Sequence, residues 1–458
     1  MKKNEIVQLQ IDDLAFGGRG VARDDGKVVF VDGGLPGDTV MARISKIKPD
    51  YCESTVAEII RPSPHRLKAP CRHFDICGGC KWQDYNYDQQ LKYKHEQLNS
   101  SLVHIGKFVD PPIEPAIGAR KIFYYRNKME FSFNRQGASG LNLGLHQAGS
   151  FDRVFDVDQC LLQSEISNKI VAFVRDRCRQ LNLPAYDIRN HEGLLRFLVI
   201  REGKFTGEIM VNVVSGPEYE AFEDRMMQLG KDVAHEFPEI NSLLWTINSL
   251  KANIARWDKH PAILKSGVMH GRDHIHEKLN QYRFRISPDS FFQTNSYQAQ
   301  ILYDTIIEFA EIESRDKIYD LYCGTGTIAI YISALAGKIF GVEAVPNAIE
   351  DAKFNAELNS INNLEFHVAK VEEFIDEAPK FDKVIIDPPR AGLHPKTLRG
   401  IINMRPAVLV YVSCNPATLA RDLAGFVDSG GYDLKRVVAV DMFPHTYHIE
   451  AVARLARK

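Results

Sequence analysis

The sequence lacks any apolar run that approaches the ~20 residues needed to cross a bilayer. Its start, MKKNEIVQLQIDDL, carries two lysines but no apolar stretch of the kind that forms a secretory signal. Internal repeats and low-complexity tracts are also missing, which argues against repeat arrays and disordered tails. These absences predict a cytoplasmic protein without membrane partners.

A strong net charge is absent as well. Lys and Arg total 57, Asp and Glu total 59, and the formal net charge is -2. Any contact with nucleic acid would therefore come from local patches and not from the field of the whole chain. The 458 residues, 45% hydrophobic and 25% charged, are typical of a globular protein with about three domains.

Cysteine is scarce, and its spacing is uneven. Of the eight cysteines, Cys71, Cys77 and Cys80 cluster, Cys160 follows at a distance, and the other four are scattered. In a reducing compartment this pattern favours a metal site plus free thiols over disulfides. Four thiolates suit either structural zinc or an iron-sulfur cluster, and the spacing leaves the two nearly even.

The pattern of apolar and turn residues changes twice along the chain. Residues 1–60 alternate short strands with Gly-rich turns, which predicts a small antiparallel barrel. Residues 61–270 begin with a Pro-rich linker and then mix strands and helices, which indicates an α+β unit. From about residue 315, strand, loop and helix alternate, which predicts an α/β unit with a mostly parallel sheet.

Unusual residues collect where the strands of that sheet are predicted to end, and open parallel sheets bind ligands at this edge. The first strand is followed by Gly324 and Gly326, the second ends at Glu343, the fourth at Asp387 in Asp-Pro-Pro-Arg, and the fifth at Cys414. The glycines alone fit a tight turn or a dinucleotide site equally well. A hydride-transfer enzyme needs neither Asp387 nor Cys414, so the two together favour a different chemistry.

Cys414 stands just before a predicted helix, with Asn415 as N-cap and Pro416 as first helical residue. The positive end of a helix lowers the pKa of a nearby thiol. We therefore expect a reactive thiolate, in preference to an inert buried cysteine.

Six stretches make the C-terminal part similar to the RNA uracil-C5 methyltransferase family: DSFFQTN, DLYCGTGT, GVEAVPNAIEDAKFNAELN, DKVIIDPPRAGL, VSCNPATLARDL and DMFPHTYHIEAVARL. The N-terminal stretch IDDLAFGGRGVAR resembles the TRAM barrel, an RNA-binding module. The resemblance implies a TRAM (OB-like) barrel at 1–60, a central α+β domain at 61–270 and a class I, Rossmann-like methyltransferase domain at 271–458.

The resemblance also implies the chemistry. Cys414 would add to C6 of uracil, S-adenosylmethionine would supply the methyl group to C5, and Glu450 would remove the C5 proton. Burial of Glu450 within an apolar strand would raise its pKa and strengthen it as a base. His445 and His448 could orient Glu450 or lie in the core, and the core is the favoured expectation.

The implied cofactor residues are Gln293, Tyr322, Glu343 and Asp387, together with the glycine loop at Gly324 and Gly326. The family pattern also favours a [4Fe-4S] cluster on Cys71, Cys77, Cys80 and Cys160. Its distance in sequence from the sheet edge suggests a structural role.

The expected substrate is an exposed or flipped uridine. The TRAM barrel and cluster cysteines together favour large-subunit (23S) ribosomal RNA, with a monomeric enzyme. Arg126 and Lys128 are candidate RNA contacts, whereas Phe131 and Phe133 are expected in the core. Alternatives are the same chemistry on transfer RNA, amino N-methylation through Asp-Pro-Pro-Arg, and a non-enzymatic RNA-binding protein.

Overall fold

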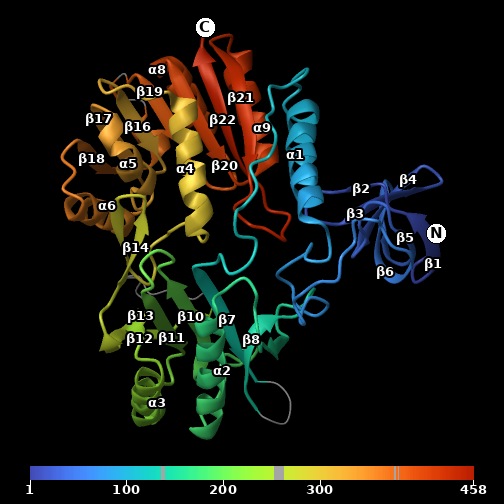
Figure 1. The fold of residues 1–458 in the computed structure, drawn as a ribbon, viewed down its shortest axis with the longest axis vertical. Helices are drawn as coiled ribbons and strands as arrows, with labels where there is room; N and C mark the ends of the chain where they lie inside the picture. The colour runs from blue at the N-terminus through green and yellow to red at the C-terminus, as the bar shows by residue number, and fades with distance from the viewer. Residues whose placement is uncertain (136–139, 252–262, 376–377, 380) are drawn as a thin grey trace.

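The computed structural model describes residues 1–458 except 136–139, 252–262, 376–377 and 380. Within those limits its strands form an N-terminal sheet, a central sheet, a short ribbon and a C-terminal sheet. Figure 1 shows the N-terminal sheet to one side of the central and C-terminal sheets, which lie one below the other. No helix in the described ranges has the length and apolarity needed to cross a membrane.

The N-terminal sheet has the order β1-β5-β6-β4-β3-β2. Its strands are β1 (Ile6–Gln10), β2 (Asp13–Leu14), β3 (Gly20–Asp24), β4 (Lys27–Asp32), β5 (Thr39–Ile47) and β6 (Tyr51–Arg61). Asp25 and Gly26 both have positive φ between β3 and β4, as a two-residue hairpin turn requires. The sheet surrounds an apolar core that includes Leu9, Val29 and Ile44, so the β-rich unit predicted at the N-terminus is confirmed. The prediction that it is antiparallel throughout is wrong, because β4 and β6 pair in parallel.

The central sheet has the order β13-β12-β11-β10-β7-β8-β9. Its strands are β7 (Lys128–Asn134), β8 (Asn142–His146), β9 (Val154–Asp156), β10 (Leu195–Glu202), β11 (Ile209–Ser215), β12 (Ile240–Asn248) and β13 (Ile263–Gly271). Helices α2 (Glu165–Gln180) and α3 (Glu223–Glu236) share a buried apolar core with this sheet. Phe131 and Phe133 belong to that core, as expected.

The C-terminal sheet has the order β18-β17-β16-β19-β20-β22-β21. Its strands are β16 (Lys317–Leu321), β17 (Lys338–Glu343), β18 (Leu364–Val368), β19 (Lys383–Ile386), β20 (Val408–Ser413), β21 (Tyr432–Val440) and β22 (Glu450–Arg457). The first five are parallel, and β22 is antiparallel to both of its neighbours. The inner strands β19 and β20 are buried throughout, as parallel strands covered on both faces require.

Helices cover both faces of this sheet. One layer holds α4 (Ser296–Ala310), α5 (Thr327–Ile332) and α6 (Pro346–Leu358), and the other holds α7 (Val371–Phe374), α8 (Pro395–Met404) and α9 (Pro416–Asp428). The ribbon of β14 (Ile275–Leu279) and β15 (Tyr282–Ile286) packs against α6. The α/β fold class predicted for this half is therefore confirmed.

One segment from residues 61–270 also packs on the C-terminal sheet. Helix α1 (Tyr87–His104) lies against α9 and contributes Leu98 and Leu102 to the same core. Ile113 and Ile117 then form parallel bridges to Val437 and Val440 of β21. The C-terminal sheet and its helices are thus covered at one edge by a segment that lies far upstream in the sequence.

Candidate functional site

A cavity of about 1300 Å³ opens at the edge of the C-terminal sheet where the parallel strands end. Most of the predicted site residues line it: Gln293, Tyr322, Gly324, Glu343, Asp387, Cys414 and Glu450. They come from five strands and from the segment before α4, so folding is needed to bring them together. Gly326 is not in the lining. It is the N-cap of α5, with φ 72°, and a Cβ atom there would lie 2.8 Å from the Phe366 ring, so its role is backbone geometry and packing.

The loop after β16 is held by the carboxylate that ends β17. Glu343 accepts hydrogen bonds from the backbone N–H of Gly324 at 3.3 Å and of Val345 at 2.9 Å. Behind the loop, burial raises the pKa of Asp320 to about 8, and its Oδ2 accepts from Ala329 N–H at 3.0 Å. These contacts fix the glycine loop at the rim of the cavity.

Two more carboxyl groups, those of Glu450 and Asp387, line the same cavity and interact electrostatically. Burial raises the pKa of Glu450 well above its ordinary value, the neighbouring Asp387 adds to the shift, and Arg390 opposes it. Burial also raises the pKa of Asp387. Because each negative charge disfavours the other, ionisation of one carboxyl group makes ionisation of the other less favourable. A positively charged ligand would favour their ionised forms.

Cys414 follows β20 and stands just before the N-cap of α9. Asn415 accepts from Ala417 N–H at 3.1 Å, and its side-chain amide donates to the Arg390 carbonyl oxygen at 3.0 Å. Thr418 also donates to that oxygen, at 3.3 Å. The turn that presents the thiol is therefore tied to the loop that carries Arg390.

The expectation of a lowered thiol pKa is wrong for this structure. Burial raises the pKa of Cys414, and the Glu450 and Asp387 carboxylates add to the effect. Arg390 works in the opposite direction through its charge and a hydrogen bond. Burial and the two carboxylates therefore outweigh Arg390, which is the cation that favours the thiolate. Sequence reasoning assigned Arg390 no role, although it ends the Asp-Pro-Pro-Arg motif.

The two histidines differ. His445 is 3% exposed and stacks on Phe123 with 4.4 Å between ring centroids, as expected of a core residue. His448 is half-buried, lines the cavity beside Cys414, and has a pKa lowered to about 4 by burial and nearby cations. The core expectation for His448 is therefore wrong, and its ring is neutral at physiological pH.

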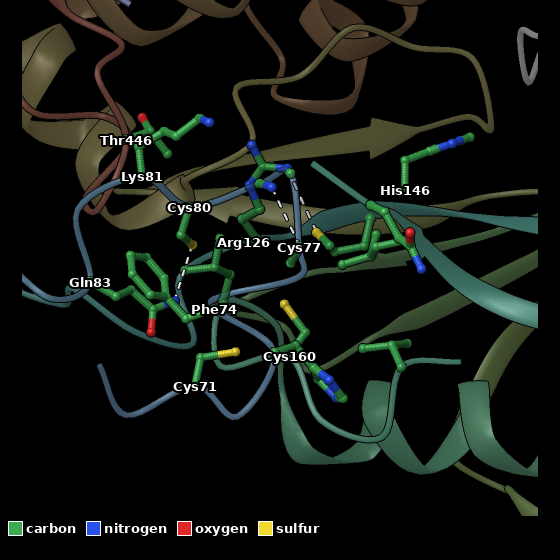
Figure 2. A pocket seen from close by; sticks show the side chains of 18 of the residues that line it. Cys71, Phe74, Cys77, Cys80, Lys81, Gln83, Arg126, His146, Cys160 and Thr446 are labelled. Atoms are coloured by element: carbon green, nitrogen blue, oxygen red, sulfur yellow. Dashed lines mark hydrogen bonds between the residues drawn. The ribbon is translucent and has the colours of Figure 1, made fainter. Parts of the chain in front are cut away.

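A second cavity, of about 970 Å³, is lined by Cys71, Cys77, Cys80 and Cys160. Figure 2 shows these cysteines around one space. All four thiols are free, and two accept hydrogen bonds: Cys77 from Gly79 N–H at 3.4 Å and Cys80 from the Gln83 amide at 3.1 Å. Among the described residues, no group of three or more His, Cys, Asp or Glu could hold a single metal ion.

The two cavities are neighbours despite their separation in sequence. Thr294 and His448 line both of them. Arg126 and Lys128, the candidate RNA contacts, also line the cysteine cavity. The Lys128 ammonium group forms an ion pair with Glu130 at 2.7 Å.

The strand order and the cavity at the carboxyl edge define a Rossmann-like methyltransferase with a cysteine and a buried acid in its site. Two family models match the chain: "TRAM domain" at residues 2–57 and "tRNA (Uracil-5-)-methyltransferase" at residues 239–458. An uncharacterized RNA methyltransferase of Halalkalibacterium halodurans is 38% identical over 463 residues, which cover 100% of this chain and 98% of the relative. One from Bacteroides thetaiotaomicron is 41% identical over 466 residues, covering 96% and 99%.

A solved structure is similar over nearly the whole chain. It is that of the Pyrococcus abyssi tRNA (uracil-54, C5)-methyltransferase in complex with S-adenosyl-L-homocysteine, with 31% identity and a TM-score of 0.78. The match covers 98% of this chain and 100% of that one. The chain therefore belongs to the RNA uracil-C5 methyltransferase family and is an S-adenosylmethionine-dependent enzyme. This membership favours carbon methylation over the hydride-transfer, amino N-methylation and non-enzymatic alternatives.

Proposed function

We propose that Cys414 is the nucleophile and Glu450 the base in C5 methylation of a uridine. The Cys414 thiolate forms a bond to C6, which moves an electron pair through the enolate onto C5. Bound S-adenosylmethionine would supply the methyl group that C5 accepts, with S-adenosylhomocysteine as the leaving group. Glu450 then takes the C5 proton, the C5–C6 double bond re-forms, and the bond between Sγ and C6 breaks to restore the thiolate.

The observation that carries this proposal is the register between β20 and β22. Ser413 pairs with Ala451 at the end of these antiparallel strands. Continuing the register by one residue brings Cys414 opposite Glu450, and both side chains line the same cavity. A nucleophile for C6 and a base for the adjacent C5 have to approach one pyrimidine ring together. Adjacent positions on paired strands meet that requirement.

Arg390 and Asp387 complete the chemistry. Arg390 favours the thiolate form of Cys414 before attack, because its charge and hydrogen bond oppose the effect of burial. Asp387 lies close enough to Glu450 to raise its pKa, so Glu450 is a stronger base than an exposed carboxylate.

The residues at the sheet edge suit the cofactor. Glu343, fixed by two backbone N–H groups, would accept from ribose hydroxyls, and Gly324 leaves the backbone open to close approach. Tyr322 and Gln293 line the same cavity and would pack against the nucleoside and the methionine portion. Gly326 would act only through the shape of the loop.

Cys71, Cys77, Cys80 and Cys160 would hold a [4Fe-4S] cluster. The four thiols line a cavity larger than a single ion needs, and amide donors reach two of the sulfurs, a common feature around iron-sulfur clusters. Structural zinc would need the four sulfurs close around one point.

Protein purified without oxygen should contain about four iron and four sulfide ions per chain. Cys160→Ala should lose the iron and sulfide because one of four ligands is missing. Cys178→Ala is a matched control, since Cys178 is also a buried thiol but does not line the cavity. Elemental analysis that finds one zinc per chain and no sulfide contradicts the assignment.

We also propose that the substrate is large-subunit ribosomal RNA. The chain would bind it with three domains: a TRAM domain at 1–60, a central domain at 61–270 and the methyltransferase domain at 271–458. Support comes from the pairing of a TRAM unit with four cluster cysteines. Transfer RNA is the second candidate, because the Pyrococcus abyssi enzyme named for uracil 54 of transfer RNA matches over 98% of this chain.

Unmodified transcripts of both RNAs test this choice. Incubation with methyl-labelled cofactor, followed by nuclease digestion and nucleoside mass spectrometry, should find 5-methyluridine in the 23S transcript and not in transfer RNA. Cys414→Ala provides the blank for non-enzymatic labelling. Methylation of the transfer RNA transcripts alone would instead establish the second candidate.

A further inference from the structure

Residues 441–449, called the strap here, connect β21 to β22 and end next to Glu450. The residue before the strap, Val440, pairs with Glu450 across the two strands. Both ends of the strap therefore meet at the backbone pair that holds the base. The strap also carries His448, which lines the catalytic cavity.

The start of the strap is held by a buried ion pair between Lys94 on helix α1 and Asp441 of the strap. Lys94 of α1 donates to Asp441 Oδ1 at 2.6 Å and to the Phe443 carbonyl oxygen at 3.2 Å, and Tyr87 donates to Asp441 Oδ2 at 2.7 Å. The Lys94 and Asp441 side chains are each 1% exposed. A buried ion pair adds little net stability, yet losing one partner is costly because the other charge is left unpaired. Such a pair is better suited to fixing an arrangement than to strengthening the fold.

The middle of the strap is fixed at His445. Gln90 of α1 accepts from His445 N–H at 3.0 Å, and its amide nitrogen lies 3.3 Å from His445 Nδ1. The backbone N–H groups of Lys81 and Trp82, directly after Cys80, donate to the His445 carbonyl oxygen at 2.9 and 3.1 Å. His445 has φ 66°, a left-handed conformation that a non-glycine residue keeps only when its surroundings hold it.

The strap forms a wall between the two cavities. Thr446, Tyr447 and His448 line the cysteine cavity, whereas Phe443 and His448 line the catalytic one. Lys94 and Gln90 line neither cavity, so neither is placed to touch substrate or cofactor. They act on the catalytic cavity through their contacts with the strap, and the charge of Lys94 also helps to lower the pKa of His448 on the strap.

We infer that Lys94 is a positioning residue that sets the course of the strap and thereby aligns Glu450 for removal of the C5 proton. Gln90 and the backbone after Cys80 support the same arrangement. This inference rests on the proposed roles of Cys414 and Glu450. Cys414 lies on the β20–α9 turn, and among the described residues that turn is hydrogen-bonded to the Arg390 loop and not to the strap. Loss of Lys94 should therefore slow proton removal more than thiol attack.

The test compares Lys94→Met with Lys92→Met, an exposed lysine on the same helix whose side chain is 57% exposed. Two quantities are measured: formation of the covalent complex on 5-fluorouridine RNA, and release of product from ordinary uridine RNA. Lys94→Met should form the complex at nearly the parent rate but release product about 100-fold more slowly, the scale expected for a misplaced catalytic group. A complex stable to denaturant should therefore accumulate on ordinary RNA. Lys92→Met should match the parent.

Glu450→Gln is the reference, because it removes the base itself. If Glu450→Gln accumulates the complex and Lys94→Met does not, the positioning role is overturned while the proposed function stands. If Glu450→Gln accumulates none, the proposed base is wrong. Gln90→Met is the second variant and should give a smaller effect of the same kind. Should both α1 variants fail to bind S-adenosylhomocysteine in calorimetry, their contacts serve folding as a whole and the inference is overturned.

Discussion

Replacing Glu450 with glutamine should leave the enzyme covalently attached to its RNA. Glutamine keeps the size of the side chain but cannot accept the C5 proton, so thiol addition and methyl transfer proceed and elimination stops. Removing a positioned base slows its step by roughly 10²–10⁴-fold. Denaturing electrophoresis of Glu450→Gln with ordinary uridine RNA and cofactor should show a shifted band that carries the methyl label.

A distant carboxylate provides the control for this variant. Glu373 lies on α7 with a side chain that is 65% exposed, and Glu373→Gln should turn over without a shifted band. Product release from Glu450→Gln at the parent rate would rule out Glu450 as the base, and Asp387 would become the next candidate.

Replacing Cys414 with alanine should abolish both methylation and the covalent complex. Without addition at C6, C5 of uracil is too weak a nucleophile to accept a methyl group. Loss of a covalent nucleophile reduces turnover on the order of 10⁶-fold in enzymes where it has been removed. S-adenosylhomocysteine binding, measured by calorimetry, should remain close to that of the parent because the glycine loop and Glu343 are untouched.

Cys323 is the matched thiol for this comparison. It is 6% exposed, follows β16 at the same edge of the sheet, and does not line the catalytic cavity. Cys323→Ala should keep the covalent complex. Retained methylation by Cys414→Ala would mean that the methyl group reaches the RNA without a sulfur adduct at this position.

The order of strands and helices in the C-terminal half follows from local pattern. Buried runs such as residues 383–386 and 408–413 alternate with capped amphipathic helices, and this alternation allows few topologies. Because parallel strands end at one edge, residues scattered between 322 and 414 could be predicted to share a site. The resemblance to the family, and not the strand pattern, predicts that Glu450 belongs to the same site. In the structure the antiparallel strand β22 brings it to that edge.

Features that depend on packing between distant segments could not be predicted in this way. The pKa of Cys414 depends on how far Glu450, Asp387 and Arg390 lie from the thiol, and a helix start seen in sequence says nothing of them. His448 lines a cavity whose walls come from β7, β8, the segment that carries Cys71, Cys77 and Cys80, and the strap. That cavity exists only once these distant segments have packed together. Likewise, nothing in the local sequence of α1 indicates that Lys94 pairs with Asp441, 347 positions away.

The cysteine site shows the same limit. Sequence distance from the sheet edge suggested a separate structural element. In the fold, its cavity shares Thr294 and His448 with the catalytic cavity, and the backbone after Cys80 contacts the strap. A cluster in this position would stabilise the segment that leads to the base, without taking part in methyl transfer.

The most direct measurement is mass spectrometry of the complex formed with 5-fluorouridine RNA and S-adenosylmethionine. Fluorine at C5 cannot leave as a proton does, so the reaction stops after methyl transfer with sulfur bound to C6. After digestion, the peptide containing Cys414 should carry one nucleotide with both fluorine and a methyl group. A nucleotide attached to any other residue, or methylated RNA with no attached peptide, would contradict the central role of Cys414.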